Sequence, residues 1–166
     1  MDKGSIHIFC GEGKGKTTAA IGQGIREASQ GRSVIIIQFM KEKNAEEIGF
    51  VQRLEPEIKL FRFQKSEEAF EQLPDAEKEE ESKNLKNALN FARKVLVTEE
   101  CDVLILDEVL GLVEAGVIEA EELHALFDAK GESTDLILTG IYPAREIWQY
   151  ADEVTEMVTA FKAERT

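Results

Sequence analysis

Residues 6–20, IHIFCGEGKGKTTAA, join an apolar run to a helical pattern through a loop rich in glycine. Glycines at 11, 13 and 15 let the backbone turn tightly and approach an anion closely. A strand before such a loop and a helix after it direct N–H groups and the positive end of the helix to one place. Lys16 adds a charge for phosphates, and Thr17 adds a hydroxyl for magnesium. The stretch therefore predicts a phosphate-binding loop.

The spacing of this loop departs from the common pattern G-x-x-x-x-G-K-[ST]. Counting back five places from Gly15 reaches Cys10, where the pattern requires glycine. The first glycine is Gly11, so the loop is one residue short. The loop is therefore either a failed nucleotide site or a site that holds a triphosphate in another way. Alternating glycines followed by Lys-Thr-Thr favour a working site.

A pair of acids follows a second apolar run, DVLILD at residues 102–107. Asp107 ends this run and Glu108 comes directly after it. Carboxylates at the carboxyl end of a parallel strand lie in the crevice where open α/β sheets bind ligands. They can hold magnesium directly or through water. Glu108 could equally orient an attacking water or bind the metal, and the spacing does not decide between these roles.

Apolar runs alternate with helical patterns along the rest of the chain. We expect strands at 5–10, 33–39, 58–63, 102–107, 135–140 and 153–158. We expect helices at about 15–30, 44–54, 76–99, 119–129 and 143–151. Nearly continuous Val, Ile and Leu in several runs indicates strands buried on both faces. The predicted fold is one α/β domain over residues 1–166, a three-layer, doubly wound and mostly parallel sheet of P-loop NTPase (RecA-like) architecture.

The composition excludes several classes of protein. The net charge is −13, from 33 acidic and 20 basic residues, so no basic stripe is available to bind nucleic acid. No apolar run approaches the roughly 20 residues that span a bilayer, and residues 1–10 lack the pattern of a signal peptide. The two cysteines, Cys10 and Cys101, do not form a disulfide framework, which favours the cytoplasm.

Four motifs, in this order along the chain, indicate a resemblance to a known protein family. They are GEGKGKTTAAIGQGIREASQGRSVIIIQFMK at 11–41, LILDE at 104–108, LILTG at 136–140 and ADEVTEM at 151–157. Together they resemble the P-loop type of ATP:corrinoid adenosyltransferase from about residue 6 to residue 157. The short loop is a mark of that family, as are the Gln-Phe at 38–39 and the Leu-Asp-Glu.

The resemblance implies a reaction and a set of site residues. In this family the nucleotide lies in a reversed sense along the loop, and a Co(I) corrinoid attacks C5′ of ATP so that triphosphate leaves. The implied substrates are ATP and a corrinoid such as cobalamin, with Mg²⁺. Lys16 and Glu108 match catalytic positions, and Thr17, Asp107 and Glu108 match metal-binding positions. The implied nucleotide-binding residues are Gly11, Glu12, Gly13, Lys14, Gly15, Lys16, Thr17, Thr18, Arg26 and Gln38.

The chain departs from the family in the part that meets the corrinoid. The family's Gly-Phe-x-Trp motif after the third strand is missing, and Phe63 and Phe70 are the nearby aromatics, with core packing the simpler role for Phe63. Ile141 stands where the family has an arginine, and Arg145 is the nearest replacement. The family's Lys-His pair is also missing, because Ala163 follows Lys162.

Two other functions stay open at this point. A different P-loop ATPase or kinase would form ADP, and a non-catalytic regulatory subunit would bind ATP without forming product. The resemblance also implies a homodimer. The acidic segment 66–81, SEEAFEQLPDAEKEEE, is either a solvated loop and helix start or a lid near the ligand.

Overall fold

The computed structural model describes residues 4–40, 51–66 and 68–165, which contain a six-stranded parallel sheet. Every strand pairing in it is parallel, as the buried apolar runs predicted. The spatial order is β3-β2-β4-β5-β1-β6. The strands are β1 Ile6–Cys10, β2 Val34–Gln38, β3 Ile58–Arg62, β4 Val103–Asp107, β5 Asp135–Gly140 and β6 Glu153–Glu156.

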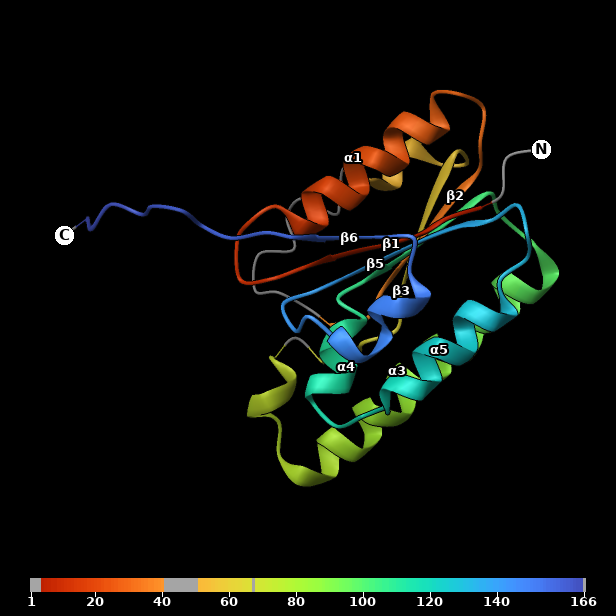
Figure 1. Cartoon of the computed structure of the whole chain (residues 1–166). Helices are drawn as coiled ribbons and strands as arrows, with labels where there is room; N and C mark the ends of the chain where they lie inside the picture. Colours follow the sequence, from red (N-terminus) through yellow and green to blue (C-terminus); the bar gives the residue numbers. More distant parts are fainter. Residues whose placement is uncertain (1–3, 41–50, 67, 166) are drawn as a thin grey trace.

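Helices cover both faces of this sheet, which confirms the predicted three-layer α/β class. The first helix, α1 Lys16–Ala28, lies on one face, while α3 Asp75–Thr98, α4 Leu110–Glu114 and α5 Ala120–Ala129 lie on the other (Figure 1). Across the described ranges, no helix combines the length and the apolar character needed to cross a bilayer.

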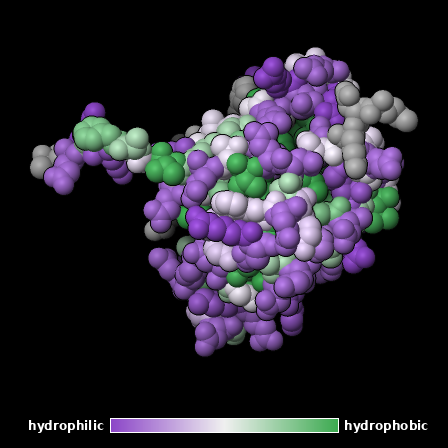
Figure 2. Space-filling model, viewed as in Figure 1, coloured by the Kyte–Doolittle hydropathy of each residue, from purple (hydrophilic) through white to green (hydrophobic). Residues whose placement is uncertain are grey.

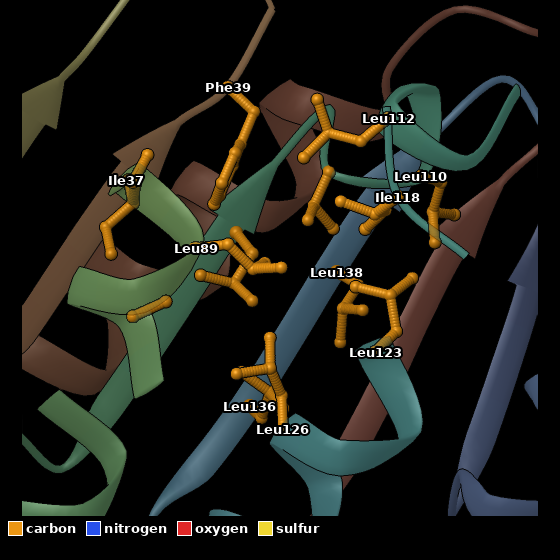
Figure 3. Close-up of a cluster of buried hydrophobic side chains, with 14 of the residues drawn as sticks. Ile37, Phe39, Leu89, Leu110, Leu112, Ile118, Leu123, Leu126, Leu136 and Leu138 are labelled. Atoms are coloured by element: carbon orange, nitrogen blue, oxygen red, sulfur yellow. The ribbon is translucent and has the colours of Figure 1, made fainter. Parts of the chain in front are cut away.

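The larger part of the core lies between the sheet and α3, α4 and α5. Figure 3 shows Leu136 and Leu138 of β5 packed toward Leu123 and Leu126 of α5. Helix α3 contributes Leu85, Ala88, Leu89, Ala92, Val95 and Leu96, a spacing that places them on one helical face. Burying these side chains removes apolar surface from water on this face of the sheet, so the strand ends are held in fixed positions.

The structure corrects several predicted elements. The segment predicted as a helix at 143–151 is a 3₁₀ helix, η4 Arg145–Tyr150, which starts after Ala144 at φ +52° and so cannot continue an α-helix from Pro143. The last strand ends at Glu156 rather than at 158, because its neighbour β1 ends at Cys10. Helix α4 was not predicted, since five mostly apolar residues carry no readable helical period.

The helix expected at 44–54 lies mostly outside the described residues, and its last part forms a 3₁₀ helix, η2 Gln52–Leu54. In the acidic segment, a 3₁₀ helix, η3 Phe70–Gln72, leads to α3, and Phe70 and Leu73 are buried while most of the acids are exposed. The described part of the segment is thus a loop and a helix start with mostly exposed acids, and the lid stays a prediction.

Candidate active site

The glycine-rich loop lies at the carboxyl edge of the sheet, between β1 and α1. Gly11 and Gly15 have φ of +106° and +108°, which side-chain-bearing residues rarely adopt. Close approach adds a second restriction, because a Cβ on Gly11 or Gly13 would stand 2.5 or 2.7 Å from the carbonyl oxygen of Met157. The loop therefore needs glycine both for its turns and for its contact with the segment after β6.

Hydrogen bonds tie this loop to its neighbours. The N–H of Gly13 donates to the carbonyl of Met157 at 2.8 Å, and the N–H of Met157 donates to the carbonyl of Cys10 at 2.8 Å. The Lys16 side chain is buried, and its Nζ donates to the carbonyl of Gly13 at 2.9 Å. The first N–H groups of α1 lack acceptors within the helix and carry its positive end, so they are available to an anion.

Asp107 is the centre of a buried network of side chains. Its Oδ1 accepts from the hydroxyls of Thr17 and Thr139, both at 2.8 Å. Its Oδ2 accepts from Nε2 of Gln38 at 3.1 Å. Asp107 and Thr139 are 3% and 0% exposed, so water competes little for these bonds. The network connects the first turn of α1 with the ends of three strands.

Glu108 follows Asp107 in an unusual backbone conformation. Its φ is +59°, a left-handed value that is uncommon for a residue with a side chain. Its N–H donates to the Thr139 hydroxyl at 2.8 Å. Thr139 therefore holds both members of the acidic pair, donating to one and accepting from the other. Strained backbone of this kind often occurs at functional sites.

Sequence reasoning did not assign Thr139 a role, although a signal for it was present. Thr139 is a polar residue near the carboxyl end of an otherwise apolar strand, in LILTG. The strand order explains its importance, since β5 lies between β1 and β4 and so separates the loop from the acids. A single sequence does not reveal that order.

Gln38 has one atom without a partner. Its Oε1 is buried and accepts no hydrogen bond from the residues that the structure describes. Its amide orientation is fixed, because the Asp107 carboxylate accepts hydrogen bonds and the Nε2 of Gln38 donates. A buried acceptor left without a donor is costly, so this oxygen is suited to an O–H or N–H group of a ligand.

The structure gathers most of the predicted site residues at one edge, with one exception. The loop residues 11–18 adjoin Asp107 and Glu108, and the side chains of Glu12, Lys14 and Thr18 are exposed at the loop. Arg26 lies in the last turn of α1, ten residues beyond Lys16 and so about 15 Å further along the helix axis. It lines a separate cavity with His7 and Glu153. Its predicted role in nucleotide binding stays a prediction.

A cavity of about 510 Å³ lies beside the loop. Its walls are the loop, the turn after β5, α4 and the segment after β6, through Gly11, Glu12, Glu114, Ile141, Tyr142, Pro143, Glu156, Met157, Val158 and Thr159. The side chains of Glu12, Glu114 and Glu156 are exposed, and none of them forms a hydrogen bond or an ion pair with another described residue. Ile141, which replaces the family's arginine, is 46% exposed here.

The residues considered for the corrinoid side have other contacts. Phe63 packs against Phe91 with ring centroids 5.6 Å apart, and Phe70 is buried in the core. The guanidinium of Arg145 lies 5.4 Å from the centre of the Trp148 ring. Arg145 is thus held at this edge by a cation–π contact.

The Cys10 thiol and the His7 imidazole lie on β1, the strand that leads into the loop. Burial, with a smaller contribution from the charge of Glu156, raises the pKa of Cys10, which keeps it a neutral thiol. Burial lowers the pKa of His7, whose Nε2 lies 2.9 Å from the Thr155 hydroxyl. Both shifts favour the uncharged forms of these side chains.

Comparisons with known proteins show the family to which the chain belongs. The family model described as ATP:corrinoid adenosyltransferase BtuR/CobO/CobP matches residues 2–163. A corrinoid adenosyltransferase of Escherichia coli (strain K12) is 28% identical over 162 residues, covering 94% of this chain and 77% of that protein. One of Salmonella typhimurium shows the same identity and coverage. Among solved structures, a KaiC-like protein of Pyrococcus horikoshii superposes with a TM-score of 0.62 at 18% identity, covering 96% of this chain and 75% of that one. That likeness concerns the fold alone.

Proposed function

The chain belongs to the ATP:corrinoid adenosyltransferase family, and we propose that it transfers the 5′-deoxyadenosyl group of ATP to the Co(I) centre of a corrinoid such as cobalamin. The cobalt supplies the electron pair of the new bond to C5′. The bond between C5′ and its oxygen breaks, and triphosphate leaves with that electron pair. Membership of this family over nearly the whole chain carries the proposal.

The loop has the groups needed to stabilise such a leaving group. The N–H groups at the start of α1 and the Lys16 ammonium would face the triphosphate, where negative charge develops as the C5′–O bond breaks. The Nζ of Lys16, which donates to the Gly13 carbonyl, would turn to the triphosphate. No protein side chain needs to act as the nucleophile, because the reduced cobalt is one.

The residues near Thr17 fit a magnesium ion. A hydroxyl and carboxylates are hard oxygen ligands of the kind that Mg²⁺ prefers, and the Thr17 and Asp107 oxygens lie 2.8 Å apart. Thr17, Asp107 and Glu108 would hold the ion directly or through water, together with the triphosphate. When bound, Mg²⁺ supplies positive charge that stabilises the leaving group. Asp107 also orients the Thr17 hydroxyl through its hydrogen bond.

The same proposal also implies an oligomeric state, a class of partner and a cellular compartment. We expect a homodimer acting on small-molecule substrates in the cytoplasm, with no nucleic-acid partner, since the net charge is −13. The free thiols of Cys10 and Cys101 suit a reducing compartment.

The test is an anaerobic incubation with Mg²⁺-ATP and chemically reduced Co(I) cobalamin. We expect a light-sensitive alkylcobalamin spectrum and one triphosphate released for each cobalt–carbon bond formed. The matched control is the Lys16→Ala variant, which keeps the fold and loses the charge. ADP and phosphate with unchanged cobalamin would instead identify an ATPase or kinase. ATP binding without any product would identify a non-catalytic subunit.

A further inference from the structure

A second cavity lies away from the phosphate loop, between the second half of α1 and the strands β1 and β6. Its volume is about 460 Å³, within the range of small-molecule sites. Its walls are formed by His7, Gly22, Gln23, Arg26, Glu27 and Glu153. Figure 2 shows mostly hydrophilic residues on the side of the body where α1 and β6 lie in Figure 1. A surface of this kind suits a small polar ligand better than an apolar one.

Gly22 keeps this cavity open at a cost to the helix. Only proline is less favourable than glycine in a helix interior, so a glycine there calls for a reason. Gly24 has one, because a Cβ at that position would stand 3.0 Å from Ile105 and 3.3 Å from Val34. A Cβ on Gly22 would meet no described atom within 4 Å, so packing in the described part of the chain does not require glycine. The missing side chain instead leaves space in the cavity.

Three polar side chains on the cavity walls have hydrogen-bonding capacity that the rest of the protein does not use. Gln23, Arg26 and Glu153 form no hydrogen bond and no ion pair with another described residue. Glu27 differs, since its carboxylate pairs with Arg32 at 2.7 Å. A guanidinium, an amide and a carboxylate around one space are the kind of polar groups that orient a bound small molecule.

The two charges of the cavity come from different elements. The helix contributes the guanidinium of Arg26 and the amide of Gln23, which are three residues apart and so lie on one face of α1. The edge strand contributes the carboxylate of Glu153, which is opposite His7 in the register of β6 and β1. The Nε2 of His7 lies 2.9 Å from the Thr155 hydroxyl, and burial lowers the pKa of His7, so its ring adds no charge near neutral pH. One cation and one carboxylate therefore remain for a ligand.

We propose that this cavity binds a small zwitterion of the α-amino acid class, with its carboxylate at Arg26 and Gln23 and its ammonium at Glu153. Guanidinium groups bind carboxylates through charge-assisted hydrogen bonds, and a carboxylate accepts equally well from an ammonium. A free anion is less suited, because the protein as a whole carries a net charge of −13. The Arg26 end of the cavity lies about 15 Å along α1 from Lys16, so this ligand is additional to the substrates under "Proposed function".

Ligand-detected NMR and isothermal titration of the full chain with the common L-amino acids, one at a time and without nucleotide, test the proposal. We expect at least one of them to bind at a single site on each chain. Replacing its amino group or its carboxylate by hydrogen should weaken binding about tenfold or more, because each change removes one charge-assisted contact. If no amino acid binds, or if the deaminated acid binds as tightly as its parent, the proposal is wrong.

Two substitutions at Gly22 form a matched pair that separates the cavity from the fold. Gly22→Ala and Gly22→Leu should both raise the midpoint of thermal unfolding, because both residues favour a helix more than glycine does. Alanine should keep most of the affinity for the amino acid, whereas leucine should lower it about tenfold or more by filling the cavity. Unchanged affinity in the folded leucine variant would place the amino acid elsewhere and overturn the proposal.

Variants of the two charged residues test each wall of the cavity. Glu153→Gln should abolish the preference for the amino acid over its deaminated form, and Arg26→Gln should abolish the preference over its decarboxylated form. Because Arg26 is also a predicted nucleotide-binding residue, the titration is repeated with saturating ATP. The affinity for the amino acid should stay within about twofold if the two sites are separate. Displacement of the amino acid by ATP would show that the cavity belongs to the nucleotide site and would overturn the proposal.

Discussion

The sheet carries aspartates where its strands begin, here called the amino edge, and where they end, the carboxyl edge. The two groups of aspartates have different hydrogen-bond partners. At the amino edge, Asp102, Asp135 and Asp152 each accept from a backbone N–H of a neighbouring strand or its approach, at Ser33, Ser5 and Ile6. At the carboxyl edge, the carboxylate of Asp107 accepts instead from the side chains of Thr17, Thr139 and Gln38. The first arrangement fixes strands to one another, and the second fixes groups that can meet a ligand.

The difference extends to what each edge leaves unsatisfied. Arg32 pairs with Glu27 and Asp135 at 2.7 and 2.6 Å, so charges at the amino edge are matched. At the carboxyl edge, Gln38 Oε1 has no partner among the described residues and Glu108 has a left-handed backbone. Polar groups are therefore paired more fully at the amino edge than at the carboxyl edge, as expected where a site must bind and release a ligand. Four measurements test this comparison.

The largest effect is expected at Lys16. Lys16→Ala should lower kcat/KM for adenosyl transfer about 100-fold or more, because it removes a charge facing the leaving group. The matched variant is Lys130→Ala at the amino edge. The Nζ of Lys130 also donates to backbone carbonyls, those of Gly4 and Gly131. That variant should lose about 1 kcal/mol of unfolding free energy and no activity. Equal activity losses in the two variants would refute the contrast between the edges.

The next effect concerns Asp135 and depends on pH. Burial raises its pKa, but the N–H of Ser5 and the Arg32 guanidinium outweigh burial, so the net pKa lies below its usual value. A folded pKa below the unfolded one of about 3.9 gives stability that is present above that pH and is lost as pH falls through the folded pKa. Asp135→Asn should therefore destabilise the protein by about 2 kcal/mol at neutral pH and by much less in acid.

Urea unfolding at pH 7 and at pH 3 measures this difference, and the activity at pH 7 supplies the second reading. We expect adenosyl transfer by the folded variant to stay within twofold of the parent. A destabilisation of the same size at both pH values would mean that the Asp135 charge contributes nothing.

A smaller effect is expected at Thr139. Thr139→Val should lower kcat about tenfold, since both Asp107 and the Glu108 N–H lose their common partner. Thr139→Ser keeps the hydroxyl and should restore most of kcat, even if it loses stability through the missing methyl. Steady-state kinetics on all three proteins separate positioning from packing. If serine is as slow as valine, the hydroxyl alone is not sufficient, and the methyl group of Thr139 is needed as well.

The smallest effect concerns the cysteines, one near each edge. Burial raises the pKa of Cys10, and it raises the pKa of Cys101 to about 12, so both should be thiols at pH 8. A disulfide reagent should react slowly with the folded protein and rapidly with both thiols in urea. Faster reaction at Cys10 alone would show that the loop opens independently of the sheet.

Much of the fold could be predicted because it depends on local patterns. The runs at 34–38, 103–107 and 135–140 are apolar on both faces, and such runs form buried parallel strands. Gly31, at φ +84°, follows α1, and a glycine in the left-handed conformation is common just after a helix. The segment after Pro143 was predicted wrongly because its apolar spacing suits an α-helix, whereas Ala144 turns the chain into a 3₁₀ helix.

The sequence by itself determined the parts of the site that are adjacent along the chain. The loop at 11–18 and the pair Asp107–Glu108 could be read directly, because spacing within one element fixes which groups point together. Only the tertiary structure decided that β5 lies between the loop and the acids, so that Thr139 joins them, and that Met157 holds the loop from the far end of the chain. Those contacts depend on strand order and on burial of the sheet between helices, which long-range packing sets and no local pattern records.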